Sequence, residues 1–99
     1  MLEIKKTQDG NHLNLALVGR LDTTTAPELE RVVKGGLARV EELVFDLKEL
    51  EYVSSAGLRV LLSAQKIMNK QGSMVVRNSS EDLMEIFEVT GFVDILDLE

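Results

Sequence analysis

The expected fold follows from one stretch of sequence, Tyr52-Val53-Ser54-Ser55-Ala56-Gly57-Leu58-Arg59-Val60-Leu61-Leu62, which predicts a loop that leads directly into a helix. The hydroxyl groups of Ser54 and Ser55 can accept hydrogen bonds from the unpaired amides of a first helical turn. Apolar residues recur at helical spacing from Leu58 onward, and the helix is predicted to continue to about Lys70. A serine at this position is both a helix cap and a candidate site of modification.

The run that precedes this loop predicts a central strand. Leu43-Val44-Phe45-Asp46-Leu47 is short and nearly continuously apolar, which is the pattern of a strand buried on both faces between helices. We therefore expect this strand to be parallel to its neighbours. The segment from Lys48 to Val53 then carries the chain across the edge of the sheet to the serines.

The amino-terminal residues predict a hairpin and a first helix. Leu2 and Ile4 alternate with polar residues, Asp9-Gly10 favours a turn, and alternation resumes over residues 13–18, so these strands are antiparallel neighbours.

Thr25-Ala26-Pro27-Glu28 fits a capping box, in which the Thr25 hydroxyl accepts from the first turn and Glu28 reaches back. The helix that follows has an apolar face made of Leu29, Val32, Val33 and Leu37. Because Gly35-Gly36 weakens its last turns, it is predicted to end near Arg39.

The carboxyl-terminal part predicts one more strand and one more helix. Gln71-Gly72 ends the helix that begins at the serines, and Ser73-Met74-Val75-Val76-Arg77 predicts a strand. Asn78-Ser79-Ser80 caps a third helix, which Gly91 stops. The tail from Phe92 to Leu98 fits either an edge strand or a final helical turn.

These elements together predict an α/β fold, a single-domain open sandwich over residues 1–99. We expect a mostly parallel or mixed sheet of four to five strands, begun by the antiparallel hairpin, with three to four helices. Such sheets carry their functional loops at the carboxyl ends of the strands. Asp22 and the Ser54-Ser55 loop are therefore expected to lie at the same edge.

Composition narrows the class of partner. The formal net charge of −6 argues against a nucleic-acid-binding face, because neutralising phosphates requires an excess of clustered lysine and arginine. The absence of cysteine fits a reducing compartment, and no stretch resembles a signal peptide or a membrane span. We therefore expect a cytoplasmic protein with a protein partner, binding neither nucleic acid nor membrane.

The sequence offers little for catalysis. His12 is the only histidine and lies beside the predicted hairpin turn, far from any serine in the chain. The glycines match no phosphate-binding pattern. Asp46 invites comparison with phospho-aspartate receiver domains, but the turn over residues 7–10 lacks their cluster of metal-binding acids. We expect no enzymatic activity, no catalytic residue, no cofactor and no metal.

The string over residues 52–59 resembles the signature of STAS-domain anti-sigma-factor antagonists, in which an aromatic and an aliphatic residue precede Asp-Ser-Ser/Thr/Ala-Gly-Leu-Gly. Ser54 stands at the aspartate position of that signature, Ser55 at the serine that follows, and Arg59 at the second glycine. The resemblance covers nearly the full length. The segments that also resemble the family are Gly19-Arg20-Leu21-Asp22, Val44-Phe45-Asp46-Leu47 and Leu83 through Phe92.

The resemblance implies a STAS-like fold and a regulatory function. A member of this family binds a kinase-type anti-sigma factor when unphosphorylated and is switched off by phosphorylation of a serine, here Ser55 with Ser54 as the alternative. The partners implied are an anti-sigma factor serine kinase and a serine phosphatase, and we expect a monomer. The residues expected at the partner surface are Asp22, Ser54, Ser55, Gly57, Leu58, Arg59 and Leu62.

Two other functions are compatible with the sequence. In the first, the chain is an unphosphorylated STAS scaffold, or a ligand-binding or lipid-transport adaptor, whose serines only cap the helix. In the second, Ser55 is the nucleophile of a small enzyme, which is the least supported hypothesis because no base accompanies it.

Overall fold

The computed structural model describes residues 1–99, in which a hairpin is followed by alternating helices and strands. The elements are β1 (Leu2–Asp9), β2 (His12–Leu21), α1 (Ala26–Gly36), β3 (Glu42–Val53), α2 (Ser55–Gln71), β4 (Ser73–Arg77), α3 (Glu81–Thr90) and the 3-10 helix η1 (Phe92–Asp94).

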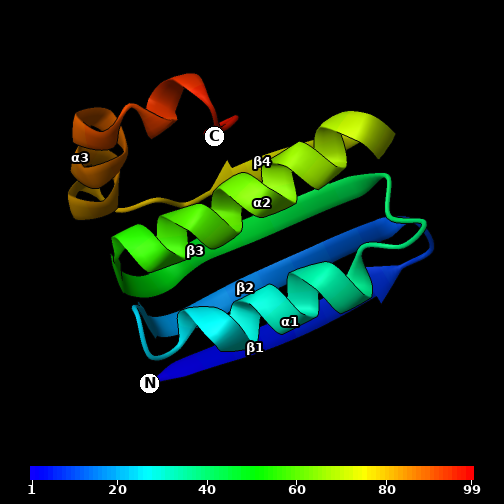
Figure 1. Cartoon of the computed structure of the whole chain (residues 1–99), viewed down its shortest axis with the longest axis horizontal. Helices are drawn as coiled ribbons and strands as arrows, with labels where there is room; N and C mark the ends of the chain where they lie inside the picture. The colour runs from blue at the N-terminus through cyan, green and yellow to red at the C-terminus, as the bar shows by residue number, and fades with distance from the viewer.

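The strands form one mixed sheet in the order β1-β2-β3-β4 (Figure 1). β1 and β2 are antiparallel, as the alternation at the amino terminus predicts. β3 is parallel to β2 on one side and to β4 on the other, which confirms its prediction as a central strand. The sheet has four strands in this order.

The core lies between the sheet and the helices. Leu43, Phe45 and Leu47 on β3 are each no more than 1% exposed and belong to one core cluster with residues of α1 and α2. The two helices lie side by side across the sheet (Figure 1). Leu13 and Leu15 on β2 point the same way, because they are registered with Leu43 and Phe45 of β3. Leu17, at a shift in this register, is buried in the same core cluster. The helices contribute Leu29, Val33, Leu61, Ala64 and Met68 to the same core.

The prediction that helices cover both faces of β3 is wrong. Ala16, Asp46 and Val75 on the opposite face are only half-buried, and a shallow hollow opens there between β2 and β3. Parallel crossovers are right-handed, so the two crossovers β2-α1-β3 and β3-α2-β4, which advance in the same direction across the sheet, place α1 and α2 on the same face. Val44 is nevertheless buried, because it lies between neighbouring strands at Asn14 and Val75.

The first helix ends earlier than predicted. α1 stops at Gly36, and Arg39, where the end was predicted, lies in the loop with a left-handed backbone (φ 66°). The side chain of Gln71, at the end of α2, donates to the carbonyl groups of Leu37 and Val40 at 2.6 and 2.7 Å. The carboxyl end of α2 therefore holds the loop that follows α1.

The carboxyl-terminal tail forms the predicted final helical turn and, in place of an edge strand, a single bridge to β4. α3 begins at the predicted cap, where the Ser80 hydroxyl accepts from the Leu83 amide at 3.2 Å, and Gly91 ends it in the left-handed conformation (φ 81°). The chain then makes the single turn η1 and returns to β4, where Leu98 pairs with Val76.

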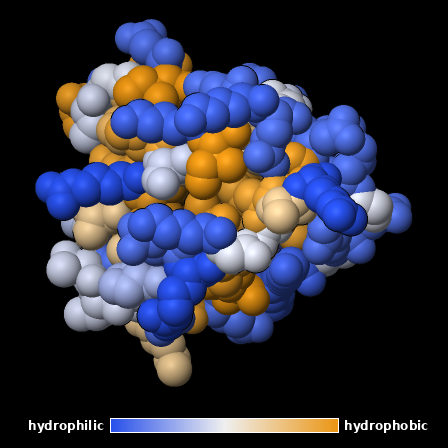
Figure 2. Space-filling view, turned by 45° about the vertical axis from the view of Figure 1, so that its right-hand side comes forward, coloured by the Kyte–Doolittle hydropathy of each residue, from blue (hydrophilic) through white to orange (hydrophobic).

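On the face that Figure 2 shows, hydrophilic side chains cross the hydrophobic surface and interrupt it. The exposed large hydrophobic residues are Met1, Tyr52, Val89 and Ile95. None of the helices combines the length and the apolar character that a membrane span requires.

Replacing Phe45 by alanine should lower the free energy of unfolding by about 3–5 kcal/mol, because the ring is fully buried and alanine leaves a cavity. Urea denaturation measures the change. As a control, Val89→Ala on α3 should cost less than about 0.5 kcal/mol, since that side chain is 78% exposed. Equal denaturation midpoints for the two variants would contradict the assignment of β3 as the centre of the core.

Candidate functional site

The loop that follows β2 and the loop that follows β3 lie next to each other at one edge of the sheet. Leu21 and Val53 are paired in the last register position of these parallel strands. The Ser54 amide extends this pairing by donating to the Leu21 carbonyl at 2.8 Å. The sequence-based expectation that Asp22 and Ser54-Ser55 share an edge is therefore correct.

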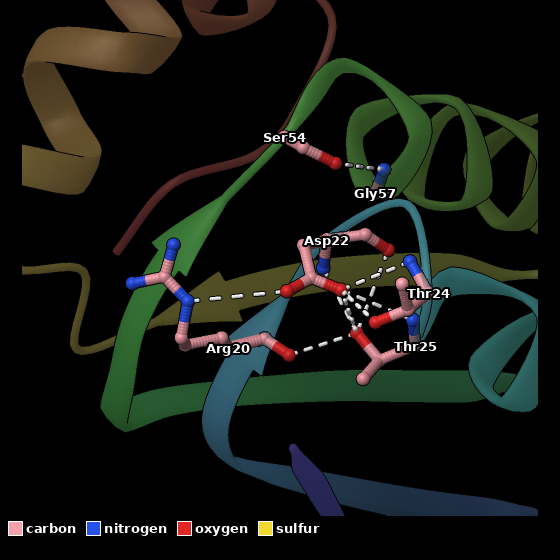
Figure 3. Close-up of polar contacts among 6 residues, drawn as sticks. All are labelled: Arg20, Asp22, Thr24, Thr25, Ser54 and Gly57. Atoms are coloured by element: carbon pink, nitrogen blue, oxygen red, sulfur yellow. Dashed lines mark hydrogen bonds and ion pairs between the residues drawn. The ribbon is translucent and has the colours of Figure 1, made fainter.

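Ser54 is the cap of α2. Its backbone is extended, and its hydroxyl accepts from the Gly57 amide at 3.3 Å, as Figure 3 shows. Its carbonyl accepts from the Leu58 amide at 2.9 Å. Ser54 thus satisfies the first turn of α2 with both its side chain and its backbone.

Ser55 has no such role. It is the first residue of α2, its side chain is exposed, and its hydroxyl has no hydrogen-bond partner within the chain. The prediction that either serine can cap the helix is therefore wrong for Ser55, because only the residue just before the first helical turn has its hydroxyl placed to accept from that turn. Ser54 is committed to structure, whereas the hydroxyl of Ser55 is free.

Gly57 allows α2 to lie directly on the ends of β2 and β3. A Cβ atom at this position would come within 2.6 Å of Leu21 Cγ and 2.9 Å of Val53 Cγ2. Gly57 and Leu58 are both buried, so the expectation that they line a partner surface needs correction. Both residues pack the start of α2 against the sheet and so fix the position of the serine loop.

Asp22 organises the other loop. One carboxylate oxygen accepts from the Thr24 hydroxyl at 2.7 Å and from the amides of Thr24 and Thr25 at 3.0 and 3.1 Å (Figure 3). The buried Thr25 hydroxyl donates to the Arg20 carbonyl at 2.8 Å and accepts from the Asp22 amide at 2.9 Å. The predicted capping box is therefore wrong, because the Thr25 hydroxyl points back toward β2 and leaves α1 without a side-chain cap at that residue.

The same hydrogen bonds hold the pKa of Asp22 below its usual value. The hydrogen bond from the Thr24 hydroxyl lowers the pKa most, and desolvation of the carboxylate opposes it. The amides of Thr25 and Thr24 and the Thr25 hydroxyl lower the pKa further. The carboxylate is therefore ionised at neutral pH.

Sequence reasoning missed Arg20 as part of this site. Its guanidinium lies 4.6 Å from the centroid of the Tyr52 ring, and its Nε atom lies 3.9 Å from a carboxylate oxygen of Asp22. Arg20, on β2, thus contacts both Tyr52 on β3 and Asp22 in the loop that follows β2. Figure 3 shows its ion pair with Asp22. The sequence places Arg20 two residues before Asp22, which is a signal that the two could pair. That Arg20 lies beside Tyr52 follows only from the register of β2 with β3.

Arg59 lies one helical turn after Ser55, and its side chain is exposed without an ion pair. It borders a groove between the amino-terminal turns of α1 and α2. The other residues that line the groove are Thr23, Ala26, Pro27, Glu30, Ala56 and Val60. Leu62, the remaining residue expected at the partner surface, is half-buried on α2. The exposed part of the site therefore consists of Ser55, Arg59 and the rims of this groove, together with the Arg20–Tyr52 pair at the ends of the strands.

The comparisons with known proteins identify the family and the fold of the chain. Residues 3–99 match the family described as the STAS domain. The anti-sigma-B factor antagonist of Listeria monocytogenes is 32% identical over 102 residues, covering 99% of this chain and 87% of that protein. An anti-sigma factor antagonist from Mycobacterium paratuberculosis has the same fold, with a TM-score of 0.89 at 22% identity over 99% of this chain and 85% of that one. The phosphorylated form of the Bacillus cell fate determinant SpoIIAA superimposes with a TM-score of 0.66 at 14% identity, covering 100% and 91% of the respective chains.

Replacing Gly57 by alanine should destabilise the protein by about 1–3 kcal/mol, because the new methyl group overlaps Leu21 and Val53. The same substitution at Gly35 provides a matched control within α1, where no atom lies within 4 Å of the added carbon. Gly35→Ala should stabilise the protein by about 0.5–1 kcal/mol through helix propensity alone. Thermal denaturation of both variants measures the contrast, and a stabilised Gly57→Ala protein would refute the close approach.

Replacing Asp22 by alanine should lower the melting temperature at neutral pH, because the amides and hydroxyl group that it accepts from lose their partner. The folded-state pKa of Asp22 lies below the unfolded value of about 3.9. Its contribution to stability is therefore fully present above that value and is lost as the pH falls through the folded pKa. The difference in melting temperature between wild type and Asp22→Ala should shrink between neutral pH and strongly acidic pH, and a constant difference would show that the charge is not responsible.

Proposed function

This chain belongs to the STAS-domain family of anti-sigma factor antagonists, and we propose that it binds a kinase-type anti-sigma factor and is released from it by phosphorylation of Ser55. Antagonism of this kind is a binding function and involves no catalysis by this chain. The bound kinase would then no longer hold its sigma factor. We place this exchange in the cytoplasm, where a sigma factor acts.

The observation that carries the proposal is the division of roles between the two serines. Ser54 caps α2 and is half-buried, whereas Ser55 presents an exposed hydroxyl that the fold does not use. A kinase can therefore modify Ser55 without removing a hydrogen bond from the folded protein. The phosphorylated form of SpoIIAA, which has this fold, provides a precedent for phosphate on such a domain.

The electrostatics of the helix start favour an interface switch over unfolding. A phosphate on Ser55 would add about −1.5 to −2 charges at neutral pH. It would lie at the amino terminus of α2, where the helix dipole and the first amides favour an anion. The Arg59 guanidinium, one turn away and free of other ion pairs, is within the usual reach of such a group. Phosphorylation would therefore leave the fold intact and change the surface that the partner meets.

Repulsion and desolvation would then end the complex, because the partner surface that fits an uncharged serine would have to accommodate a dianion. A serine phosphatase would restore the binding form. Ser54 in place of the family's aspartate leaves the loop with one fewer negative charge beside the acceptor. The kinase that acts here is expected to accept that uncharged neighbour.

The alternative, an unphosphorylated scaffold, has one observation in its favour, which is that a serine of this pair does cap the helix. In that case Ser55 is simply a surface residue, and neither its charge nor its modification affects binding. The two functions are separated by variants at Ser55, with Ser54 as the internal control.

Ser55→Asp should weaken binding to the anti-sigma factor kinase encoded in the same genome, while changing stability by no more than about 0.5 kcal/mol. Ser55→Ala should bind as the wild type does and should also change stability little, because the Ser55 hydroxyl makes no hydrogen bond. Ser54→Ala should cost about 1 kcal/mol of stability through loss of the cap. Isothermal titration calorimetry and thermal denaturation provide the two measurements.

The same variants identify the acceptor directly. After incubation with the kinase and ATP, intact-mass spectrometry should show one added phosphate on the wild type and on Ser54→Ala, and none on Ser55→Ala. Undiminished binding by Ser55→Asp, together with modification of Ser55→Ala, would move the switch to Ser54. Undiminished binding without any modification would support the scaffold.

A further inference from the structure

One border of the sheet has no covering element. β1 pairs only with β2, and Figure 1 shows β1 along the lower border with no segment beyond it. The opposite border is partly covered, because Val76 of β4 donates to the Asp97 carbonyl and accepts from the Glu99 amide, both at 2.9 Å. β1 is therefore the longest strand edge that remains free to pair.

The parity of the ladder shows which backbone groups of β1 face outward. The Arg20 amide donates to the Met1 carbonyl at 3.0 Å. The backbone groups of Met1 therefore face β2. Antiparallel ladders alternate, so the backbone groups of Leu2, Ile4, Lys6 and Gln8 point away from β2 toward solvent. The side chains of Leu2 and Ile4 lie on the helix-covered face beside Gly19 and Leu17, and those of Glu3 and Lys5 lie on the bare face.

We propose that β1 pairs antiparallel with β1 of a second copy of this chain, with the two-fold axis at Ile4. The proposal replaces the monomer expected from the sequence with a dimer. In this register the outward backbone groups of the two strands meet, and Ile4 lies opposite Ile4 of the second copy. Glu3 then lies opposite Lys5 of the second copy, and the symmetry makes this ion pair twice on the bare face of the sheet. The interface contains none of the serine loop, so the pairing does not depend on the phosphorylation proposed above.

Charge selects this register over its neighbours. A two-fold axis at Glu3, Lys5 or Lys6 would place a charged side chain opposite itself, which is unfavourable. An axis between two residues would pair outward backbone groups with inward ones. An axis at Thr7 would bring Lys5 opposite Asp9, but Ile4 would then lie opposite the turn residue Gly10.

The side chains at the Ile4 axis are suited to the contact. Glu3 and Lys5 are exposed, and neither forms an ion pair within its own chain. Ile4 is only partly buried, although it packs against the core cluster. Pairing with a second copy would bury more of the Ile4 side chain against its counterpart, with Leu2 and Lys6 as the flanking pair on that face.

Sedimentation equilibrium of the full chain from micromolar to millimolar concentration tests the proposal. We expect a reversible dimer whose dissociation constant rises with salt. Glu3→Lys places like charges together at both ion pairs and should raise the dissociation constant by about ten-fold or more. The double variant Glu3→Lys with Lys5→Glu exchanges the charges and should restore the wild-type constant.

Asp9→Lys is the matched control, since it makes the same change of net charge on the same strand but lies outside the overlap of the Ile4-centred register. Its dissociation constant should equal that of the wild type at moderate salt. Circular dichroism confirms that each variant is folded. A wild type that stays monomeric throughout, an unrestored double variant, or equal weakening by Asp9→Lys would each overturn the proposal. The first of these outcomes would mean that Lys5 and Lys6 protect the edge from pairing.

Discussion

The contact of Gly57 with Leu21 and Val53 determines how the rest of the site is built. With a hydrogen atom in place of a side chain, the first turn of α2 lies directly on the ends of β2 and β3. The Ser54 amide can then bond to the Leu21 carbonyl, and the chain must turn into the helix at that residue. Any larger residue at position 57 would lift the helix and separate the two loops. The placement of the exposed serine is thus a consequence of close packing beneath it.

Charge and hydrogen bonding then give the two loops different characters. The Asp22 loop is closed, because one carboxylate oxygen accepts from the amides of Thr24 and Thr25 and the Thr25 hydroxyl accepts from the Asp22 amide. The Ser55 position is open, since its hydroxyl and its helix terminus are left for something outside the chain. A loop closed by its own hydrogen bonds beside a free hydroxyl group suits the function proposed above, in which a partner recognises the surface by shape and a kinase changes its charge.

Much of the fold could be predicted because its signals are local. The hairpin, the Ser80 cap and the stop at Gly91 each depend on residues adjacent in sequence. The errors arose where two distant segments compete for one group. Thr25 fits a capping box, but its hydroxyl donates to the Arg20 carbonyl and does not cap α1. The run of Asp22 followed by three threonines is a sequence signal for a turn held by side-chain hydrogen bonds, and it could have shown this. The apolar run of β3 indicates burial but cannot show which layer provides it, and neighbouring strands shield Val44 as well as a helix would.

The two adjacent serines have an evolutionary consequence. Because Ser54 alone supports the helix, residue 55 can change from a modifiable residue to a permanently uncharged or permanently charged one without altering the architecture. Under the function proposed above, lineages of such domains can acquire, lose or invert responsiveness to a kinase by single substitutions that selection for folding does not oppose. Paralogous circuits could diverge at this one position while keeping the same scaffold.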